Sequence, residues 1–237
     1  MAADPSSIEL ELSDRSISVA IRRAARARRV SLRLNGRSGG PELVLPQRAP
    51  LKFGLEFARA QAGWLERHLA RITPPQKLVP GMTLPLGGID HAIKHRPALR
   101  GVALDETARV LIVGGREEHA PRRLRDFLAK RARAAIAPLA HEKAQTIGKR
   151  IAYLGIRDNR SRWGSCSSDG RLSFTWHLAL TPDPVIDYLA AHEVAHLVEM
   201  NHSARFWRLC QTLTAGDMQE SRAWLKRHGG RILAFGL

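Results

Sequence analysis

The residues with the clearest chemical meaning are two histidines four positions apart, His192 and His196, with Glu193 beside the first. On a helix, residues at this spacing lie about 40° apart around the axis and about 6 Å apart along it, so both imidazoles can bind one small cation. A carboxylate at the position of Glu193 emerges beside the ion, where it can accept a proton from a metal-bound water. The sequence therefore contains the HExxH pattern of zinc hydrolases, with two histidine ligands and a glutamate base.

A third protein ligand is expected because zinc hydrolases usually hold the metal with three side chains. His202 follows His192 by ten residues, and Asn201 tolerates a left-handed backbone that could turn His202 back over the metal. This spacing agrees with the metzincin pattern HExxHxxGxxH, although Glu199 stands at the glycine position. Glu199 is a rival ligand one turn beyond His196, but a straight helix would carry it away from the metal. We therefore predict His202 as the third ligand and a supporting or surface role for Glu199.

The segment that carries the motif has the features of an amphipathic helix. Asp183 can cap its N-terminus and Pro184 suits its first turn. Apolar side chains recur at helical spacing, namely Ile186, Leu189, Ala190, Leu197 and Val198. The motif therefore lies on the kind of element that it requires. The alternative interpretation is a chance pair of structural histidines.

The residues around this helix resemble those of a known family. The runs RDNRSRWGSCSSDGRLSFTWHLALTP and PVIDYLAAHEVAHLVEMNHSARFW are similar to YgjP-like zinc metallopeptidases, which are related to the SprT and WLM proteases. The resemblance is carried by Trp163-Gly164-Ser165-Cys166, by the HExxH helix and by the segment from His202 to Trp207. It implies one zinc ion held by His192, His196 and His202, with Glu193 as general base. Thr175 stands where this family usually has an asparagine.

The resemblance and the order of elements predict an α+β fold in two parts. Residues 116–237 are expected to form a zincin-like metallopeptidase domain with the HExxH helix, preceded by a β-rich region with one helix over residues 1–115. The strands are expected at 8–12, 17–23, 28–35, 42–45, 83–86, 89–94, 109–113, 151–160 and 172–178. The remaining helices are expected at 51–72, 120–149, 203–215 and 217–228. No internal repeat is visible in the sequence.

Several residues before the HExxH helix are candidates for contact with a substrate. An extended peptide can add to the edge of a sheet by backbone pairing, and residues 172–178 are the expected edge strand. Arg162, Trp163 and Ser165 are predicted to line the resulting cleft, although Trp163 could equally be a core aromatic residue. His177 and Arg162 are candidates to stabilise the oxyanion, and the sequence does not rank them.

The composition favours a soluble globular protein with acidic partners. Lys and Arg number 38 against 22 Asp and Glu, which gives a net charge of +16. Eight arginines between Arg15 and Arg37 could line one face of the N-terminal sheet and contact phosphates, although a solvated basic surface is the simpler interpretation. Only two cysteines occur, Cys166 and Cys210, and both are expected to be small buried residues. The chain has no apolar run that approaches a membrane span and no signal-peptide pattern, so a cytoplasmic location is expected.

Three functions are compatible with these patterns. The first is a zinc metallopeptidase that acts on a protein or peptide, including proteins bound to nucleic acid. The second is a zinc-dependent nucleotide pyrophosphatase, which the absence of a Walker loop and of an acidic metal cluster disfavours. The third is a non-catalytic, metal-stabilised nucleic-acid-binding protein, and Glu193 argues against it because a structural site does not need a base.

Overall fold

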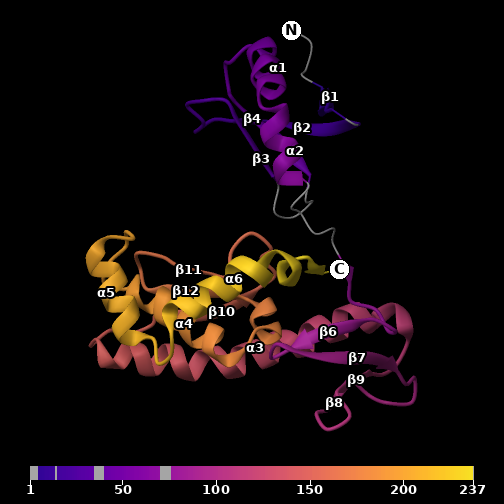
Figure 1. The fold of residues 1–237 in the computed structure, drawn as a ribbon, viewed down its shortest axis with the longest axis vertical. Helices are drawn as coiled ribbons and strands as arrows, with labels where there is room; N and C mark the ends of the chain where they lie inside the picture. Colours follow the sequence, from indigo (N-terminus) through magenta and orange to yellow (C-terminus); the bar gives the residue numbers. More distant parts are fainter. Residues whose placement is uncertain (1–4, 14, 35–39, 70–75, 237) are drawn as a thin grey trace. The chain divides into compact units, whose positions relative to one another are not determined.

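A computed structural model describes residues 5–13, 15–34, 40–69 and 76–236 (Figure 1). The chain divides into two compact units, Met1–Pro74 and Pro75–Leu237, and each has its own hydrophobic core. The division therefore lies about 40 residues before the expected boundary at 115/116. Both units mix strands and helices, as an α+β fold requires.

The first unit is a four-stranded sheet covered by helices. Its strands are β1 (Ser7–Glu11), β2 (Ser16–Ala24), β3 (Ser31–Leu34) and β4 (Pro41–Pro46), arranged in the order β1-β2-β4-β3. The outer pairs are antiparallel and the central pair β2·β4 is parallel. The strands predicted at 28–35 and 42–45 are β3 and β4, which pair antiparallel, and residues 35–39 between them lie outside the described residues.

The helix predicted at 51–72 is divided in two. Helix α1 (Leu51–Ala60) ends at Gln61, and α2 (Ala62–Leu69) follows it, while residues 70–72 lie outside the described range. The approach of α1 to the sheet is close, because a Cβ atom on Gly54 would lie 2.5 Å from Leu45 Cδ2. The core between sheet and helices is formed by Leu10, Val19, Leu43, Leu45, Ala58 and Leu65.

The second unit begins with a sheet of the same topology. After β5 (Gln76–Lys77), the strands are β6 (Thr83–Leu86), β7 (Ile89–His95), β8 (Val102–Asp105) and β9 (Val110–Val113), in the order β6-β7-β9-β8. As in the first unit, the outer pairs are antiparallel, the central pair is parallel, and a helix follows the fourth strand. The structure therefore contains two sheets of one topology that the sequence does not reveal as a repeat.

The long helix α3 (Ala120–Thr146) joins this sheet to the remainder of the unit, after a short 3₁₀ turn η1 (Glu117–His119). Figure 1 shows α3 running beneath α4 and reaching the β6–β9 sheet. Its buried stripe recurs mainly every fourth residue through Leu124, Leu128, Ala132, Ile136 and Ala140, and the helix continues across Pro138. Strands β6, β7 and β9 share this core with α3. For that reason they belong to the second unit, which explains the displaced boundary.

A three-stranded sheet follows α3. Its strands are β10 (Tyr153–Arg157), β11 (Gly164–Cys166) and β12 (Arg171–Thr175), arranged in the order β10-β12-β11. Strand β12 pairs with β10 in parallel and with β11 in antiparallel orientation, so it is the central strand. The prediction of an edge strand over 172–178 is therefore wrong. The strand ends at Thr175 and continues as the 3₁₀ helix η2 (Trp176–Leu180).

Three helices complete the unit, namely α4 (Asp183–Ala195), α5 (Ala204–Leu213) and α6 (Met218–Leu233), and the short strand β13 (Phe235–Gly236) pairs with β5. Asp183 lies inside the first turn of α4 and its side chain makes no capping bond, so its predicted capping role is wrong. Ser203, the first residue of the helix predicted at 203–215, is the N-cap of α5. Asp217 caps α6, which continues to Leu233 instead of ending at residue 228.

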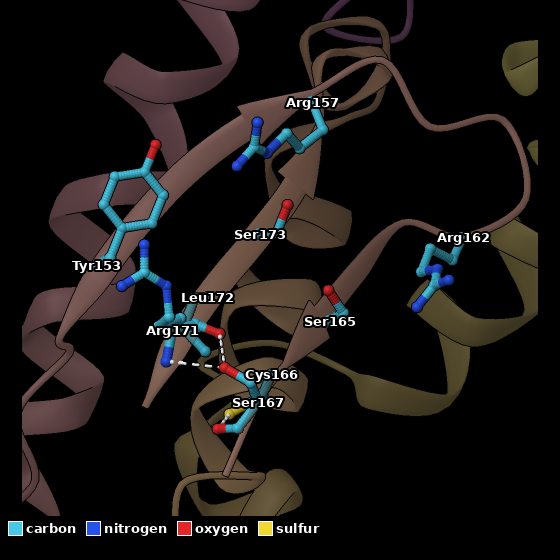
Figure 2. A pocket seen from close by; sticks show the side chains of 9 residues that line it. All are labelled: Tyr153, Arg157, Arg162, Ser165, Cys166, Ser167, Arg171, Leu172 and Ser173. Carbon is cyan, nitrogen blue, oxygen red and sulfur yellow. Dashed lines mark hydrogen bonds between the residues drawn. The ribbon is translucent and has the colours of Figure 1, made fainter. Parts of the chain in front are cut away.

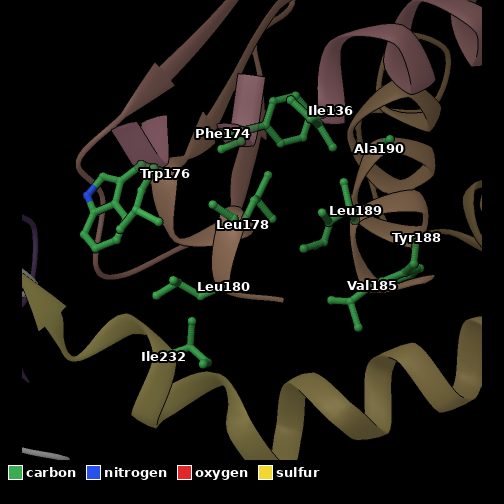
Figure 3. Close-up of a cluster of buried hydrophobic side chains, with 14 of the residues drawn as sticks. Ile136, Phe174, Trp176, Leu178, Leu180, Val185, Tyr188, Leu189, Ala190 and Ile232 are labelled. Atoms are coloured by element: carbon green, nitrogen blue, oxygen red, sulfur yellow. The ribbon is translucent and has the colours of Figure 1, made fainter. Parts of the chain in front are cut away.

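The core of the second unit lies where η2, α3, α4 and α6 meet. Figure 3 shows Trp176, Leu178 and Leu180 of η2 facing Val185 and Leu189 of α4. All five side chains are at least 95 % buried. Helix α4 is thus buried around most of its circumference and not along one face only, so the expected amphipathic pattern is wrong. Across the described residues, no helix combines the length and hydropathy needed to cross a membrane.

Candidate metal centre

The end of α4 presents two of the three predicted ligands. His192 lies in its last turn, and His196 is the C-cap residue, with the helical backbone angles φ −65° and ψ −17°. The two rings therefore remain on one side of the helix, with centroids 5.0 Å apart. Glu193 is 5 % exposed.

His202 completes the group from the turn after α4. Its Nε2 atom lies 3.2 Å from Nε2 of His192, and one nitrogen from each of the three histidines lies within 4.8 Å of the other two. Among the described residues, Arg109 is the only non-glycine residue with a positive φ, so the predicted left-handed conformation of Asn201 is wrong. The chain turns without it, and Ser203 then starts α5 by accepting a hydrogen bond from the Phe206 amide.

The donor set fits a zinc ion. A tetrahedral site with Zn–N bonds of about 2.0–2.1 Å places its nitrogens roughly 3.4 Å apart, close to the 3.2 Å between His192 and His202. Burial, together with the neighbouring histidines, lowers the pKa of His192 to about 4, and burial also lowers the pKa of His196. Both rings are therefore neutral at pH 7, as metal ligands must be.

Hydrogen bonds orient the ligand rings. His196 Nδ1 lies 3.0 Å from the Glu199 carbonyl oxygen, so its Nδ1–H can donate there and leave Nε2 for a metal. Glu199 thus contributes its backbone, and its carboxylate does not belong to the ligand cluster of the described residues. Tyr188, one turn before His192, brings its hydroxyl within 3.4 Å of His192 Nδ1.

Aromatic rings from α5 pack against the three histidines. The buried Phe206 ring lies 4.5 to 4.9 Å from all three imidazole centroids. The Trp207 ring stacks on His202 at 5.5 Å, and the Arg222 guanidinium covers the same indole at 4.5 Å. These contacts hold the exposed His202 in place.

A buried ion pair anchors α4 from below. Lys143 of α3 places its Nζ 2.6 Å from Asp187 Oδ1, and the same Nζ donates to the Leu213 carbonyl at 2.6 Å. Asp187 Oδ2 in turn accepts the Ala215 amide at 2.7 Å. These bonds tie α3, α4 and the end of α5 together, five residues before the first histidine. The sequence held no signal for this pair, because its members are 44 positions apart.

Strand β11 forms the wall opposite Glu193. A pocket of about 290 Å³ is lined by Gly164, Ser165 and Cys166 on this side and by His192, Glu193, His196, Met200 and His202 on the other. A Cβ atom on Gly164 would lie 2.5 Å from Glu193 Oε1 and 2.7 Å from its Cγ and Cδ. Only glycine leaves room for the carboxylate here. Burial raises the pKa of Glu193 to about 8, and the positive charge of Arg162 acts against this rise.

The four candidate substrate residues have different positions. Ser165 lines the pocket at Glu193, and both Ser165 and Arg162 line a second pocket beside it. Trp163 packs against the core, with its ring near Gly229 of α6, and does not line either pocket. The structure therefore brings Ser165 to the metal centre and Arg162 to the pocket beside it.

His177 is the fourth candidate, and it lies in the core. It is fully buried, with Nδ1 2.6 Å from Thr175 Oγ1 and Nε2 2.7 Å from the Phe235 carbonyl oxygen. Burial lowers its pKa to about 4, although the bond to Phe235 opposes the shift. Both ring nitrogens have partners: Nε2–H can donate to the Phe235 carbonyl, and Nδ1 faces the Thr175 hydroxyl, which itself donates to the Asn159 carbonyl oxygen at 2.8 Å. The prediction that His177 contacts a substrate is not supported, because η2 turns it inward.

The cysteines differ from each other. Cys210 is fully buried as expected, whereas Cys166 is half-buried and lines the pocket at Glu193. Burial, with the charges of Glu193 and Asp169, raises the pKa of the Cys166 thiol to about 11. Gly164 and Cys166 line the pocket although the sequence analysis gave them no role there. The sequence feature that could have indicated them is the Trp-Gly-Ser-Cys motif, to which both belong.

The family model of the YgjP-like metallopeptidase domain matches residues 28–228. The matched range covers most of the chain, including the histidine group, and the chain belongs to this family. Comparison with curated proteins and with solved structures gives no match. A metallopeptidase domain implies a metal, and the histidine triad is a group that could bind it.

Proposed function

We propose that this protein is a zinc metallopeptidase in which His192, His196 and His202 hold the metal and Glu193 is the general base. The observation that carries the proposal is the convergence of three imidazole nitrogens within 4.8 Å, beside a carboxylate that is 5 % exposed. A purely structural site would need a fourth ligand and no neighbouring base.

The residues divide the chemistry among them. Zinc bound by the three histidines supplies an acidified water and polarises the carbonyl of a peptide bond. Glu193 would accept the proton of that water as the water oxygen attacks the carbonyl carbon, and would then pass the proton to the amine nitrogen as the C–N bond breaks. Burial raises the pKa of Glu193, which favours retention of the accepted proton until it is passed to the amine. Gly164 keeps the carboxylate within reach by leaving space for it.

The free edge of β11 is the proposed binding site for the substrate backbone. The Thr175 amide bonds to the Trp163 carbonyl, and the Ser167 amide bonds to the Arg171 carbonyl. In an antiparallel pair these bonds alternate, so the backbone groups of Gly164 and Cys166 face away from β12. Within the described part of the chain, no strand pairs with that edge. A peptide added there would pass Glu193 directly.

The ligand chemistry favours peptide over phosphate hydrolysis. In the described ranges, the histidine triad is the only group of three or more His, Cys, Asp or Glu residues that could hold an ion. Magnesium and phosphate chemistry usually uses carboxylate oxygens, which this group lacks. The pyrophosphatase alternative therefore has no observation in its favour.

Fewer N-terminal arginines are available to bind phosphates than their number suggests. Arg22 and Arg33 both pair with the 6 % exposed Glu42. Arg23 donates to the carbonyl oxygens of Pro46, Gln47 and Ala49. Contact with nucleic acid remains a proposal that a salt-dependent binding assay can test.

The test combines metal content with activity in four proteins. The wild type should carry one zinc per chain and degrade unfolded casein. His202→Ala should lose or weaken zinc binding, and Glu193→Gln should retain zinc with casein cleavage lowered by about 10²–10⁴-fold. His141→Ala, which alters an exposed histidine on α3, is the control and should match the wild type. An active Glu193→Gln protein, or release of pyrophosphate from nucleotides in place of casein cleavage, would refute the proposal.

A further inference from the structure

A second pocket adjoins the metal centre across β11. Its volume is about 340 Å³, and it shares Ser165 and Cys166 with the pocket at Glu193. We call it the arginine pocket, because its lining includes Arg157, Arg162 and Arg171, together with Tyr153, Ser165 and Ser173. Figure 2 shows these side chains on the three strands and on the loop that leads into β11.

The sheet register explains why these residues meet. Tyr153 of β10 pairs with Arg171 of β12, and Ser165 of β11 pairs with Ser173 of β12. Because side chains alternate between faces, Tyr153, Arg157, Arg171, Ser173 and Ser165 share the outer face, while Leu154, Leu172 and Phe174 enter the core. Gly155, between Tyr153 and Arg157, leaves its space to the Tyr153 ring, which lies 2.7 Å from the position of a Cβ.

The pocket is positively charged and open to a ligand. Across the described residues, none of the three arginines forms a salt bridge, although the charge of Arg162 acts on Glu193, and no Asp or Glu lines the pocket. The Arg171 guanidinium lies 4.9 Å from the centre of the Tyr153 ring, which fixes its position. The hydroxyls of Ser165 and Ser173 make no hydrogen bond within the described part of the protein, so they are available as additional donors.

We propose that the arginine pocket binds the side-chain carboxylate of an Asp or Glu residue in a protein substrate, close to the bond that is cleaved. This inference rests on the proposed peptidase function. A guanidinium fork matches a carboxylate with two parallel hydrogen bonds, and the serine hydroxyls can donate to the same group. The shared wall of β11 places such a side chain beside a backbone paired with that strand.

A nucleic acid fits the same pocket less well. Single-stranded nucleic acids stack their bases on aromatic rings. Tyr153 is the only aromatic residue that lines this pocket, and Arg171 already covers its ring. The volume is also near the lower limit for small-molecule sites, which suits one side chain.

The test maps cleavage sites in a mixture of proteome-derived peptides by mass spectrometry. Wild type is compared with Arg157→Gln/Arg171→Gln, while Arg162 is left intact because its charge acts on Glu193. In the wild type, we expect Asp and Glu to be enriched about tenfold at one position near the scissile bond, which is the preference that one charge-assisted hydrogen-bonded pair would give. In the double variant, Asp and Glu should occur at that position no more often than in the peptide mixture as a whole. Arg100→Gln, which removes an exposed charge between β7 and β8, should retain the enrichment.

A binding measurement separates the possible failures. Glu193→Gln protein is titrated with fluorescein-labelled peptides that differ only by Glu against Gln at the enriched position, and the tenfold preference should again depend on Arg157 and Arg171. Absence of any cleavage refutes the proposed peptidase function, whereas cleavage without acidic enrichment refutes this inference alone. A single-stranded oligonucleotide that binds through the two arginines more tightly than the acidic peptide would overturn the carboxylate assignment. Thermal unfolding confirms that each variant is folded.

Discussion

Replacing Gly164 by alanine should inactivate the protein without removing its metal. The added Cβ would lie 2.5 Å from Glu193 Oε1, whereas ordinary contact begins at 3.4 Å. We expect the carboxylate to move by about 0.9 Å, because the added Cβ is attached to the backbone of β11, which is less free to move than the Glu193 side chain. Misplacement of a reacting group by about 1 Å can cost roughly 10²-fold in rate.

The expected result is a fall in kcat/KM on casein of about 10²-fold with one zinc per chain retained. Gly164 has no positive φ, so the alanine variant meets no conformational penalty of its own and the effect reports the contact. Gly230→Ala on α6 is the matched control, because nothing lies within 4 Å of its Cβ position. It should keep full activity and gain up to about 1 kcal/mol of stability from its helix propensity.

Two outcomes would contradict this reasoning. If Gly164→Ala retains activity within about threefold of the wild type, then β11 does not position Glu193 or Glu193 is not the base. If the variant loses zinc, the glycine acts on the ligands instead of on the carboxylate. Metal analysis and kinetics on the same preparation distinguish these outcomes.

Two further predictions concern buried groups of the second unit. Lys143→Met should lower the free energy of unfolding by about 3–5 kcal/mol and the Tm by about 6–20 °C, because it leaves Asp187 buried without its cation. In a double-mutant cycle with Asp187→Leu, the double variant should lose less than the sum of the single variants, and strict additivity would refute the coupling. His177 should titrate near pH 4 in NMR spectra, far below the ordinary value of 6.5. Between these pH values the unfolded chain binds more protons, so acidification should cost on the order of 3 kcal/mol, and a titration near 6.5 would contradict its burial as the cause.

Much of the fold could be predicted locally, and the errors occur where pairing is non-local. Most of the predicted strands and helices are confirmed with shifted ends, because alternation and helical periodicity are local signals. Strands β8 and β11 were not predicted, and the helix predicted at 51–72 is divided in two. The unit boundary is different because β6, β7 and β9 bury their apolar faces against α3, which the sequence does not indicate. Likewise, the β1–β4 and β6–β9 sheets have the same strand order, but their sequences show no visible repeat.

The sequence by itself determined the spacing of His192, Glu193 and His196, because the geometry of one helix places residues four apart on one side. It also determined that His202 is near enough in the chain to join them. Only the tertiary structure decided that β11 and not β12 is the sheet edge, that Gly164 makes room for Glu193, and that η2 turns His177 into the core. These features depend on which strands pair and which surfaces pack, and such contacts join residues that local patterns do not connect.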